Sequence, residues 1–261
     1  MTKRGKEFAP NRQDSLNHMQ TVACIKWGTA YPADYVNRLY RGVMRHVQRP
    51  TQFVIFTDDA TGLEPGIEVR PIPEIRLPEK GLRRGPWRKL ALWSRDLGVT
   101  GDILFLDLDV VITGPLDVFF DYEPGKLCLI KNWTREDHGM GNSSVMRFPA
   151  GGAPHLIDDF EKDAVRMSFH YTNEQFYLTR ESRLPTAFWP PEWCPSFKHN
   201  LVPRFPLNWW RNVPLPKDAR IVVFTGSPRP HEALQGKWPA RWYKKVYKKI
   251  RPVTWMKDHW V

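Results

Sequence analysis

Two carboxylates stand where a run of apolar residues ends, and their type and spacing could hold a metal ion. The apolar run at residues 103–106 leads directly into Asp107 and, two residues later, Asp109. Alternate residues of a strand point to the same face, so we expect the two side chains one pleat apart. Such a pair repels itself unless a cation lies between the carboxylates, and their oxygens suit Mg²⁺ or Mn²⁺. The alternative is a pair of solvated acids in a turn at the end of a strand.

The elements that must position this pair alternate between strands and helices. Short apolar runs predict strands at residues 22–26, 53–56, 103–106, 127–130 and 221–224. Pro32 begins a helix whose apolar residues recur at helical spacing, and Pro86 begins a second helix that Gly98 ends. This order predicts an α/β fold with a largely parallel sheet, in which functional loops lie at the carboxyl ends of the strands.

In the order of its motifs, the chain resembles a family of enzymes. The segment around Asp107 and Asp109 is similar to the D-x-D metal site of nucleotide-sugar-dependent glycosyltransferases with the GT-A fold. It is most similar to the retaining enzymes of family 8, which include glycogenin and bacterial lipo-oligosaccharide galactosyltransferases. Further motifs follow in the family's order across residues 22–231. The resemblance implies an α/β fold of GT-A type, with a mixed, mostly parallel central sheet flanked by helices.

The resemblance also implies an activity. Enzymes of this family transfer a hexose, with retention, from a nucleotide diphosphate sugar to an acceptor hydroxyl. For this chain it implies a UDP-sugar as donor, a glycan or a lipid-linked molecule as acceptor, and Mn²⁺ or Mg²⁺ as cofactor. The metal would neutralise charge on the leaving diphosphate.

Two segments before the acidic pair match the part of the family that holds the donor. Thr29 and Tyr31 occupy the family's nucleotide loop, where a flat aromatic ring suits a nucleobase. Arg88 and Lys89 match a family helix whose basic residue contacts the sugar and phosphate of the donor. An ordinary strand-to-helix loop and a solvated lysine are the alternatives at these positions.

Two polar segments after the acidic pair match the part of the family that grips the donor sugar. Asn142 and Ser143 correspond to residues that hydrogen-bond sugar hydroxyls, although Ser144 replaces the usual glycine. Glu174 and Gln175 resemble an Asp-Gln pair, with the carboxylate one methylene further out. This second segment could instead form a helix capping box, because a threonine stands three residues before Gln175.

The last motif departs from the family at the metal. Val223 occupies the position of the family's metal-binding histidine and cannot coordinate, whereas His231 follows where the family has tryptophan. The metal is therefore held either by Asp107, Asp109 and His231 or by the two carboxylates with water. Arg229 replaces the family's diphosphate-binding lysine and could clamp phosphate with two parallel hydrogen bonds.

These assignments define catalytic roles. Asp109 and Lys89 would act on the departing diphosphate, Glu174 would hold the sugar, and Gln175 would lie nearest to the reacting carbon. An amide is a poor nucleophile, so we favour attack on the same face as the leaving group over a covalent intermediate. A diphosphate oxygen would take the proton of the acceptor.

The net charge of +11 sits mainly at the two ends of the chain. Residues 1–12 hold four basic and one acidic side chain, residues 237–261 hold eight and one, and the remainder holds 27 and 26. This pattern predicts a flexible basic arm (1–20), a catalytic domain (21–236) and a basic, aromatic, amphipathic tail (237–261), with no nucleic acid as partner.

A helix over residues 239–250 would set aromatic rings opposite lysines, which suits an anionic membrane surface. Packing of that apolar face on the domain is equally compatible with the pattern.

Composition bears on location. Three cysteines without C-x-x-C spacing fit a reducing compartment. The sequence contains no secretory signal and no apolar run of the roughly 18 residues that a spanning helix needs. We therefore expect a cytoplasmic protein, peripheral at the inner face of the membrane.

Two other function classes stay open. Asp107 and Asp109 also resemble the nucleophile motif of haloacid dehalogenase-like phosphatases, in which Asp107 would attack phosphorus. That family begins its domain with this strand and needs a later pair of acids, whereas here the strand is far from the start of the chain. The other class is a non-enzymatic binder of anionic surfaces, which only the tails support.

Overall fold

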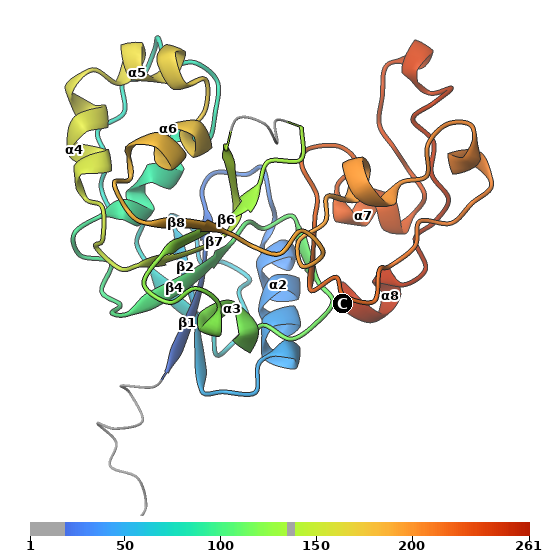
Figure 1. The fold of residues 1–261 in the computed structure, drawn as a ribbon, viewed down its shortest axis with the longest axis horizontal. Helices are drawn as coiled ribbons and strands as arrows, with labels where there is room; N and C mark the ends of the chain where they lie inside the picture. The colour runs from blue at the N-terminus through green and yellow to red at the C-terminus, as the bar shows by residue number, and fades with distance from the viewer. Residues whose placement is uncertain (1–18, 135–138) are drawn as a thin grey trace, which may run out of the picture.

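The computed structural model describes residues 19–134 and 139–261, so the predicted arm (1–20) lies almost wholly outside it. At its centre is a seven-stranded sheet in the order β3-β2-β1-β4-β7-β6-β8 (Figure 1). The strands β1 to β4 pair in parallel, as do β6 and β8, and β7 is antiparallel to both of its neighbours. Their bounds are β1 (Gln20–Lys26), β2 (Thr51–Thr57), β3 (Glu68–Arg70), β4 (Asp102–Leu106), β6 (Leu127–Lys131), β7 (Gly141–Pro149) and β8 (Thr186–Phe188). The predicted α/β fold with a mixed, mostly parallel sheet is confirmed.

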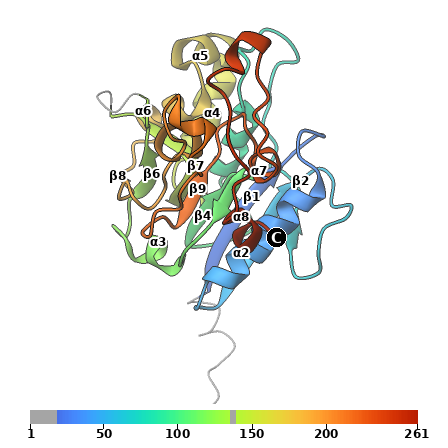
Figure 2. The same cartoon turned by 90° about the vertical axis from the view of Figure 1, so that its right-hand side faces the viewer.

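Helices cover both faces of this sheet (Figures 1 and 2). One face carries α2 (Ala33–His46) and a two-stranded sheet of β5 (Val110–Ile112) and β9 (Ile221–Val223). The other face carries α4 (His155–Lys162), α5 (Ala164–Tyr171) and α6 (Glu174–Glu181). Alternation along β1 feeds both cores, because Val22 and Cys24 pack on the first face and Ala23 and Ile25 on the second. Shorter helices are α3 (Asp117–Asp121), α7 (Pro230–Leu234) and α8 (Met256–His259).

The helix predicted from Pro86 to Gly98 is wrong in type and in length. The structure has a 3-10 helix there that spans only Trp87–Trp93. Pro86 precedes it as expected, but the chain leaves the helical conformation at Ser94. Six of its seven residues are buried, so the segment packs on all sides and not along one stripe. Tertiary packing therefore overrides the helical periodicity here.

The acidic pair lies in a turn and not along one strand, so the predicted pleat between the two carboxylates is wrong. β4 ends at Leu106, Asp109 lies in a turn, and β5 begins at the next residue. The turn is anchored on both sides. The Asp107 N–H donates to the Ser144 carbonyl at 2.8 Å, and the Phe224 N–H donates to the Asp109 carbonyl at 3.1 Å.

The helix predicted over residues 239–250 is also wrong. The segment contains one 3-10 turn, Trp242–Lys244, and side chains of a distant segment hold much of the backbone that follows. The Asn208 amide donates to the carbonyls of Tyr247 and Lys249 at 2.8 and 2.7 Å. Tertiary hydrogen bonds replace those of a helix.

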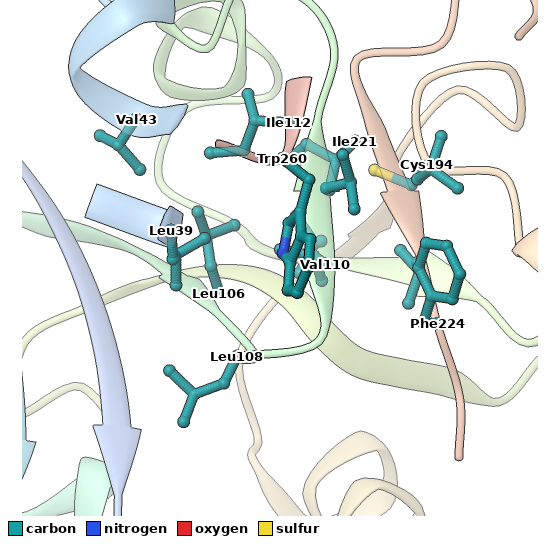
Figure 3. Close-up of a cluster of buried hydrophobic side chains, with 14 of the residues drawn as sticks. Leu39, Val43, Leu106, Leu108, Val110, Ile112, Cys194, Ile221, Phe224 and Trp260 are labelled. Carbon is teal, nitrogen blue, oxygen red and sulfur yellow. The ribbon is translucent and has the colours of Figure 1, made fainter. Parts of the chain in front are cut away.

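The end of the chain packs on the domain. Val253, Met256 and Trp260 are buried in the same core as α2, β5 and β9. Figure 3 shows the Trp260 ring beside Val110, and Arg38 of α2 donates to the Trp260 carbonyl at 2.8 Å. Across residues 19–134 and 139–261, none of the helices has the length and apolar character needed to cross a bilayer.

Candidate active site

A cavity of about 380 Å³ opens at the carboxyl ends of β1 and β4. In sheets of this kind, ligands bind at this edge, and a cavity with a few convergent polar groups is the usual form of a binding site. Seven residues singled out from the sequence line it: Tyr31, Lys89, Asp107, Asp109, Ser143, Glu174 and Gln175. Residues that sequence reasoning did not single out complete the wall: Ile25, Lys26, Trp27, Ala30, Pro86, Leu108 and Asn173.

Lys89 is a buried cation of this cavity, with only 4% of its surface exposed, and Lys26 in the same wall is 5% exposed. Its ammonium donates to Asp107 Oδ1 at 2.7 Å and to the carbonyl and hydroxyl of Ser143 at 2.9 and 3.1 Å. Glu174 Oε1 lies 3.8 Å away, and the ring of Phe105 lies beneath the ammonium at 4.4 Å. Anionic and dipolar groups thus surround the buried ammonium, as the burial of a basic side chain requires. The solvated-lysine alternative is therefore wrong.

Glu174 is held at the cavity by α6. The Ser143 hydroxyl donates to Glu174 Oε1, and the Ser143 N–H donates to Gln175 Oε1 at 3.4 Å. The N-cap of α6 is Asn173, whose side chain accepts from the Phe176 N–H at 3.0 Å. The capping box that the sequence left open is therefore not formed, and Gln175 faces the cavity. Burial raises the pKa of the Glu174 carboxyl, against the nearby charge of Lys89.

Asp109 forms the other side of the cavity with Tyr31. The Tyr31 hydroxyl donates to Asp109 Oδ2 at 3.0 Å. Burial, and then the negative charge of Asp107, raise the pKa of Asp109 above its usual range. The same surroundings raise the pKa of the Tyr31 phenol, chiefly through burial and then the charge of Asp109. The protein's own groups thus leave the negative charge of Asp109 under-compensated.

Arg229 and His231 approach this group from the far end of the chain. The Arg229 guanidinium lies over the ring of Tyr31, 4.7 Å from its centre, and donates to the Ala30 carbonyl at 3.0 Å. His231 Nδ1 is hydrogen-bonded to the Tyr35 hydroxyl, which leaves Nε2 as the nitrogen that could reach a metal. The start of α7 therefore brings Arg229 to Tyr31 and His231 to Tyr35, next to the cavity.

The side chains that could coordinate a divalent cation are a pair of carboxylates, Asp107 and Asp109. Asp107 and Asp109 repel each other, which is the condition that a bound cation relieves. In the described parts of the chain, no three His, Cys, Asp or Glu side chains gather closely enough to hold a metal. The arrangement therefore matches two carboxylates with water more closely than a three-residue set that includes His231.

Five predicted residues are not part of the cavity lining: Arg229 and His231, which stand beside it, and Thr29, Arg88 and Asn142. Thr29 is exposed, and Arg88 points to Asp58 on the outer side of the loop, 4.0 Å away. Asn142 is buried, and its side chain accepts from the Ser144 N–H at 3.0 Å. Arg88 and Lys89 are adjacent in sequence but face opposite environments.

Sequence reasoning missed two aromatic residues of the site. Trp27 stands directly after β1, two residues before Thr29 of the predicted nucleotide loop, and it lines the cavity, so its position in the sequence was a usable signal. Tyr35 is on the buried face of α2, and its ring packs edge-on against Tyr31 and His231. Its partner lies 196 residues away, so no local pattern could have found it.

The paired acids that a phosphatase would need are elsewhere. Asp158 and Asp159 are on α4, where they pair with Arg95 and Lys162 at the surface. Neither lines the cavity that contains Asp107. The structure offers no support for Asp107 as a phosphatase nucleophile.

The fold is that of the GT-A glycosyltransferases. No family model and no curated protein matches the sequence. The structure is similar to the galactosyltransferase LgtC, solved with donor and acceptor sugar analogues, at 11% identity over 81% of this chain and 89% of that one, with a TM-score of 0.54. It is similar to the glycosyltransferase GlyE of Streptococcus pneumoniae, at 14% identity over 81% and 56%, with a TM-score of 0.53. It is also similar to the bifunctional glycosyltransferase WbbM, at 11% identity over 82% and 47%, with a TM-score of 0.54.

Proposed function

We propose that this protein is a metal-dependent, retaining glycosyltransferase that moves a hexose from a nucleotide diphosphate sugar, a UDP-sugar by family resemblance, to a glycan or lipid-linked acceptor hydroxyl. The GT-A fold supports the class of reaction. The observation that carries the proposal is the buried Lys89 ammonium, bonded to Asp107 and Ser143 beside Glu174 in a cavity at the carboxyl ends of the strands. This arrangement supplies charge for a phosphate and polar groups for a sugar.

The polar residues predicted from the sequence have distinct roles in the proposal. Asp107 and Asp109 would hold Mn²⁺ or Mg²⁺, which would supply Lewis-acid stabilisation of the diphosphate. Lys89 and Arg229 add fixed positive charge where negative charge develops, a contribution that is usually large. Ser143 and Glu174 orient the hydroxyls of the sugar.

The proposal includes retention by attack on the same face as the leaving group. Gln175 faces the cavity beside Glu174, but its amide is a poor nucleophile. We therefore assign it to positioning of the sugar near the reacting carbon. Tyr31 and Trp27 offer flat rings for the nucleobase.

We extend the proposal to location. The enzyme works in the cytoplasm, peripheral at the inner face of the membrane, where the basic tail contacts anionic lipid. Exposed aromatic residues between lysines support this placement, since rings and cationic heads together suit a lipid interface. A lipid-linked acceptor would then be presented at the same surface.

The test is release of the nucleotide. Purified protein is incubated with UDP-glucose, UDP-galactose, UDP-GlcNAc or GDP-mannose, with and without Mn²⁺, and the released nucleoside diphosphate is measured. We expect one donor to be turned over only with metal, and Asp109→Asn to lower turnover by about 10³-fold. Asp96→Asn, an exposed acid outside the cavity, is the matched control.

Unchanged turnover in the Asp109 variant would refute the site assignment. Release of phosphate from simple phosphate esters, without any nucleotide sugar and with loss in an Asp107→Asn variant, would favour the phosphatase class instead. A product of inverted anomeric configuration would refute retention while leaving the donor site intact.

A further inference from the structure

Exposed aromatic and aliphatic side chains gather on two short segments that are distant in sequence. Eight of the thirteen large apolar side chains exposed in the described chain belong to residues 203–211 and 237–251. Trp242 is 83% exposed and Trp210 is 57% exposed, which is costly for side chains of this size unless a partner covers them. We call these two segments together the aromatic platform. Its exposed apolar members are Phe205, Leu207, Trp209, Trp210, Trp242, Tyr243, Val246 and Tyr247.

The two segments form one surface because side chains of the first bond the backbone of the second. The Trp209 indole N–H donates to the Val246 carbonyl at 2.7 Å, next to the Asn208 bonds to Tyr247 and Lys249. The Arg251 guanidinium returns a hydrogen bond to the Trp210 carbonyl at 3.2 Å. In Figure 1 this platform belongs to the orange and red lobe, on the opposite side of the molecule from α4 and α5.

The charge of the platform has one sign. Residues 203–211 and 237–251 contain nine lysine or arginine side chains and no aspartate or glutamate. Some of the ammonium groups lie over aromatic rings, as Lys249 does over Trp209 at 4.9 Å and Lys248 over Trp238 at 5.6 Å. The long stems of these lysines therefore add to the apolar surface while their heads stay at its rim.

We propose that the aromatic platform is a preformed surface for an anionic lipid bilayer, in which residues 203–211 take part as much as the tail does. Exposed rings beside lysines suit the boundary between headgroups and acyl chains, and basic residues attract anionic lipid. The aliphatic Leu207 and Val246 suit acyl chains, whereas they would add nothing to stacking on nucleobases. This inference deepens the peripheral attachment put forward as part of the proposed function.

A surface built from both segments and a helix formed by the tail alone predict different effects of substitutions in residues 203–211. If a helix formed by the tail were enough, changes in residues 203–211 would leave membrane binding intact. If the two segments act as one surface, loss of a ring from either one weakens binding. Trp210 and Trp242 are the sharpest pair for this test, because both are exposed and neither side chain holds the other segment's backbone.

The experiment is co-sedimentation of the full chain with vesicles, without donor. Vesicles of phosphatidylcholine are compared with vesicles that also contain phosphatidylglycerol. We expect binding only to the anionic vesicles, weakened about 5-fold by Lys245→Gln and by similar amounts in Trp210→Ala and Trp242→Ala. Phe169→Ala on α5, 58% exposed on another part of the molecule, is the matched control and should bind like the parent chain.

Three outcomes would overturn the inference. Absence of binding to anionic vesicles would remove the partner. Loss in Trp242→Ala with none in Trp210→Ala would assign attachment to the tail alone. Stronger binding to a short single-stranded oligonucleotide than to vesicles, lost in both variants, would identify a nucleic acid as the partner. Release of nucleotide from a soluble donor without vesicles is measured separately, so failure of the transferase proposal is distinguishable from failure of this one.

Discussion

Lys89 and Arg147 are both buried basic side chains beside the strand pair β4–β7, and their partners differ in kind. Arg147 has no exposed surface, and its guanidinium donates to backbone carbonyls that include those of Phe119 (2.7 Å), Tyr122 and Glu123. Asp102 lies 3.5 Å from its Nε. Lys89, in contrast, is bonded to Asp107 and lies near Glu174, both of which line an open cavity.

The difference teaches how to separate a structural cation from a functional one. The carbonyls around Arg147 include those at the end of α3, whose negative dipole end stabilises a cation, and they are fixed by the fold. These carbonyls accept hydrogen bonds from the two terminal nitrogens of Arg147, which does not line the cavity, while its Nε has no hydrogen-bond partner among the described residues. The carboxylates around Lys89 can be shared with a metal, a phosphate or a sugar hydroxyl. Burial alone is therefore no sign of catalysis, and the nature of the partners decides.

The largest effect we expect is on activity, from Lys89→Met. The change removes the cation that compensates Asp107 and Glu174 and that faces the diphosphate in the proposed reaction. Turnover should fall by about 10³-fold, as it does when a group that stabilises developing charge is lost. The measurement is nucleotide release at saturating donor, together with thermal unfolding.

The control for this prediction is Lys80→Met, which removes an exposed lysine outside the cavity and should change neither property. If Lys89→Met loses stability but keeps its turnover per folded molecule, Lys89 is structural and the comparison with Arg147 fails.

Next in size is the stability effect of Arg147→Met. The variant leaves several carbonyls buried without a donor and leaves Asp102 without its cation, so unfolding should become easier by about 3 kcal/mol. In a chain of this length each kcal/mol lowers Tm by about 2–4 °C, which gives a drop of about 6–12 °C. The free energy of unfolding in urea checks this, and kcat per folded molecule should be unchanged. Loss of kcat with an unaltered Tm would reverse the roles of the two cations.

Much of the frame that holds these two side chains could be predicted from sequence. The long buried strands at residues 22–26, 53–56 and 103–106 and the helix after Pro32 follow from apolar patterning, and the structure confirms them. The short strands β3, β5 and β8 have three residues each, and they depend on neighbours that the chain brings in from elsewhere. The two expected helices over residues 86–98 and 239–250 failed because buried neighbours and side chains from residues 203–211 set the backbone there.

The part of the site that the family motifs cover could be predicted from sequence. The order of family motifs pointed to Tyr31, Lys89, Asp107, Asp109 and Glu174, and the structure places them around one cavity. Their chemical roles stay predictions. Local pattern could not show the contact of Tyr35 with α7, nor the turn that replaces a pleat after β4, because both depend on residues far along the chain.

A smaller change in stability is expected from Asp109→Asn than from the changes at Lys89 and Arg147, and it has the opposite sign to the effect at Arg147. Its pKa is raised in the folded protein, so between the unfolded pKa near 4 and the raised value the native state binds more protons than the unfolded state. Stability should therefore fall as pH rises through this window. Asp109→Asn should remove the penalty and raise the free energy of unfolding by about 1 kcal/mol at pH 8, with a smaller gain at pH 5.

Urea unfolding in EDTA at the two pH values measures the stability gain of Asp109→Asn. Asp96→Asn serves as the exposed control, with no difference between the two pH values. An equal gain at both pH values, or a loss at pH 8, would show that Asp109 carries no electrostatic penalty.

The smallest effect separates Arg88 from its neighbour Lys89, since the family resemblance assigned both to donor binding but only Lys89 to catalysis. Arg88 is exposed and lies 4.0 Å from Asp58, outside the cavity that its neighbour Lys89 enters. An exposed pair of this kind contributes little to stability, so Arg88→Ala should change Tm by less than about 2 °C. Turnover and donor KM should stay within about 3-fold of the parent, which is less than 1 kcal/mol of transition-state binding. A rise of donor KM by tenfold or more would place Arg88 on the bound donor and would show that the loop after β2 closes over the cavity during the reaction.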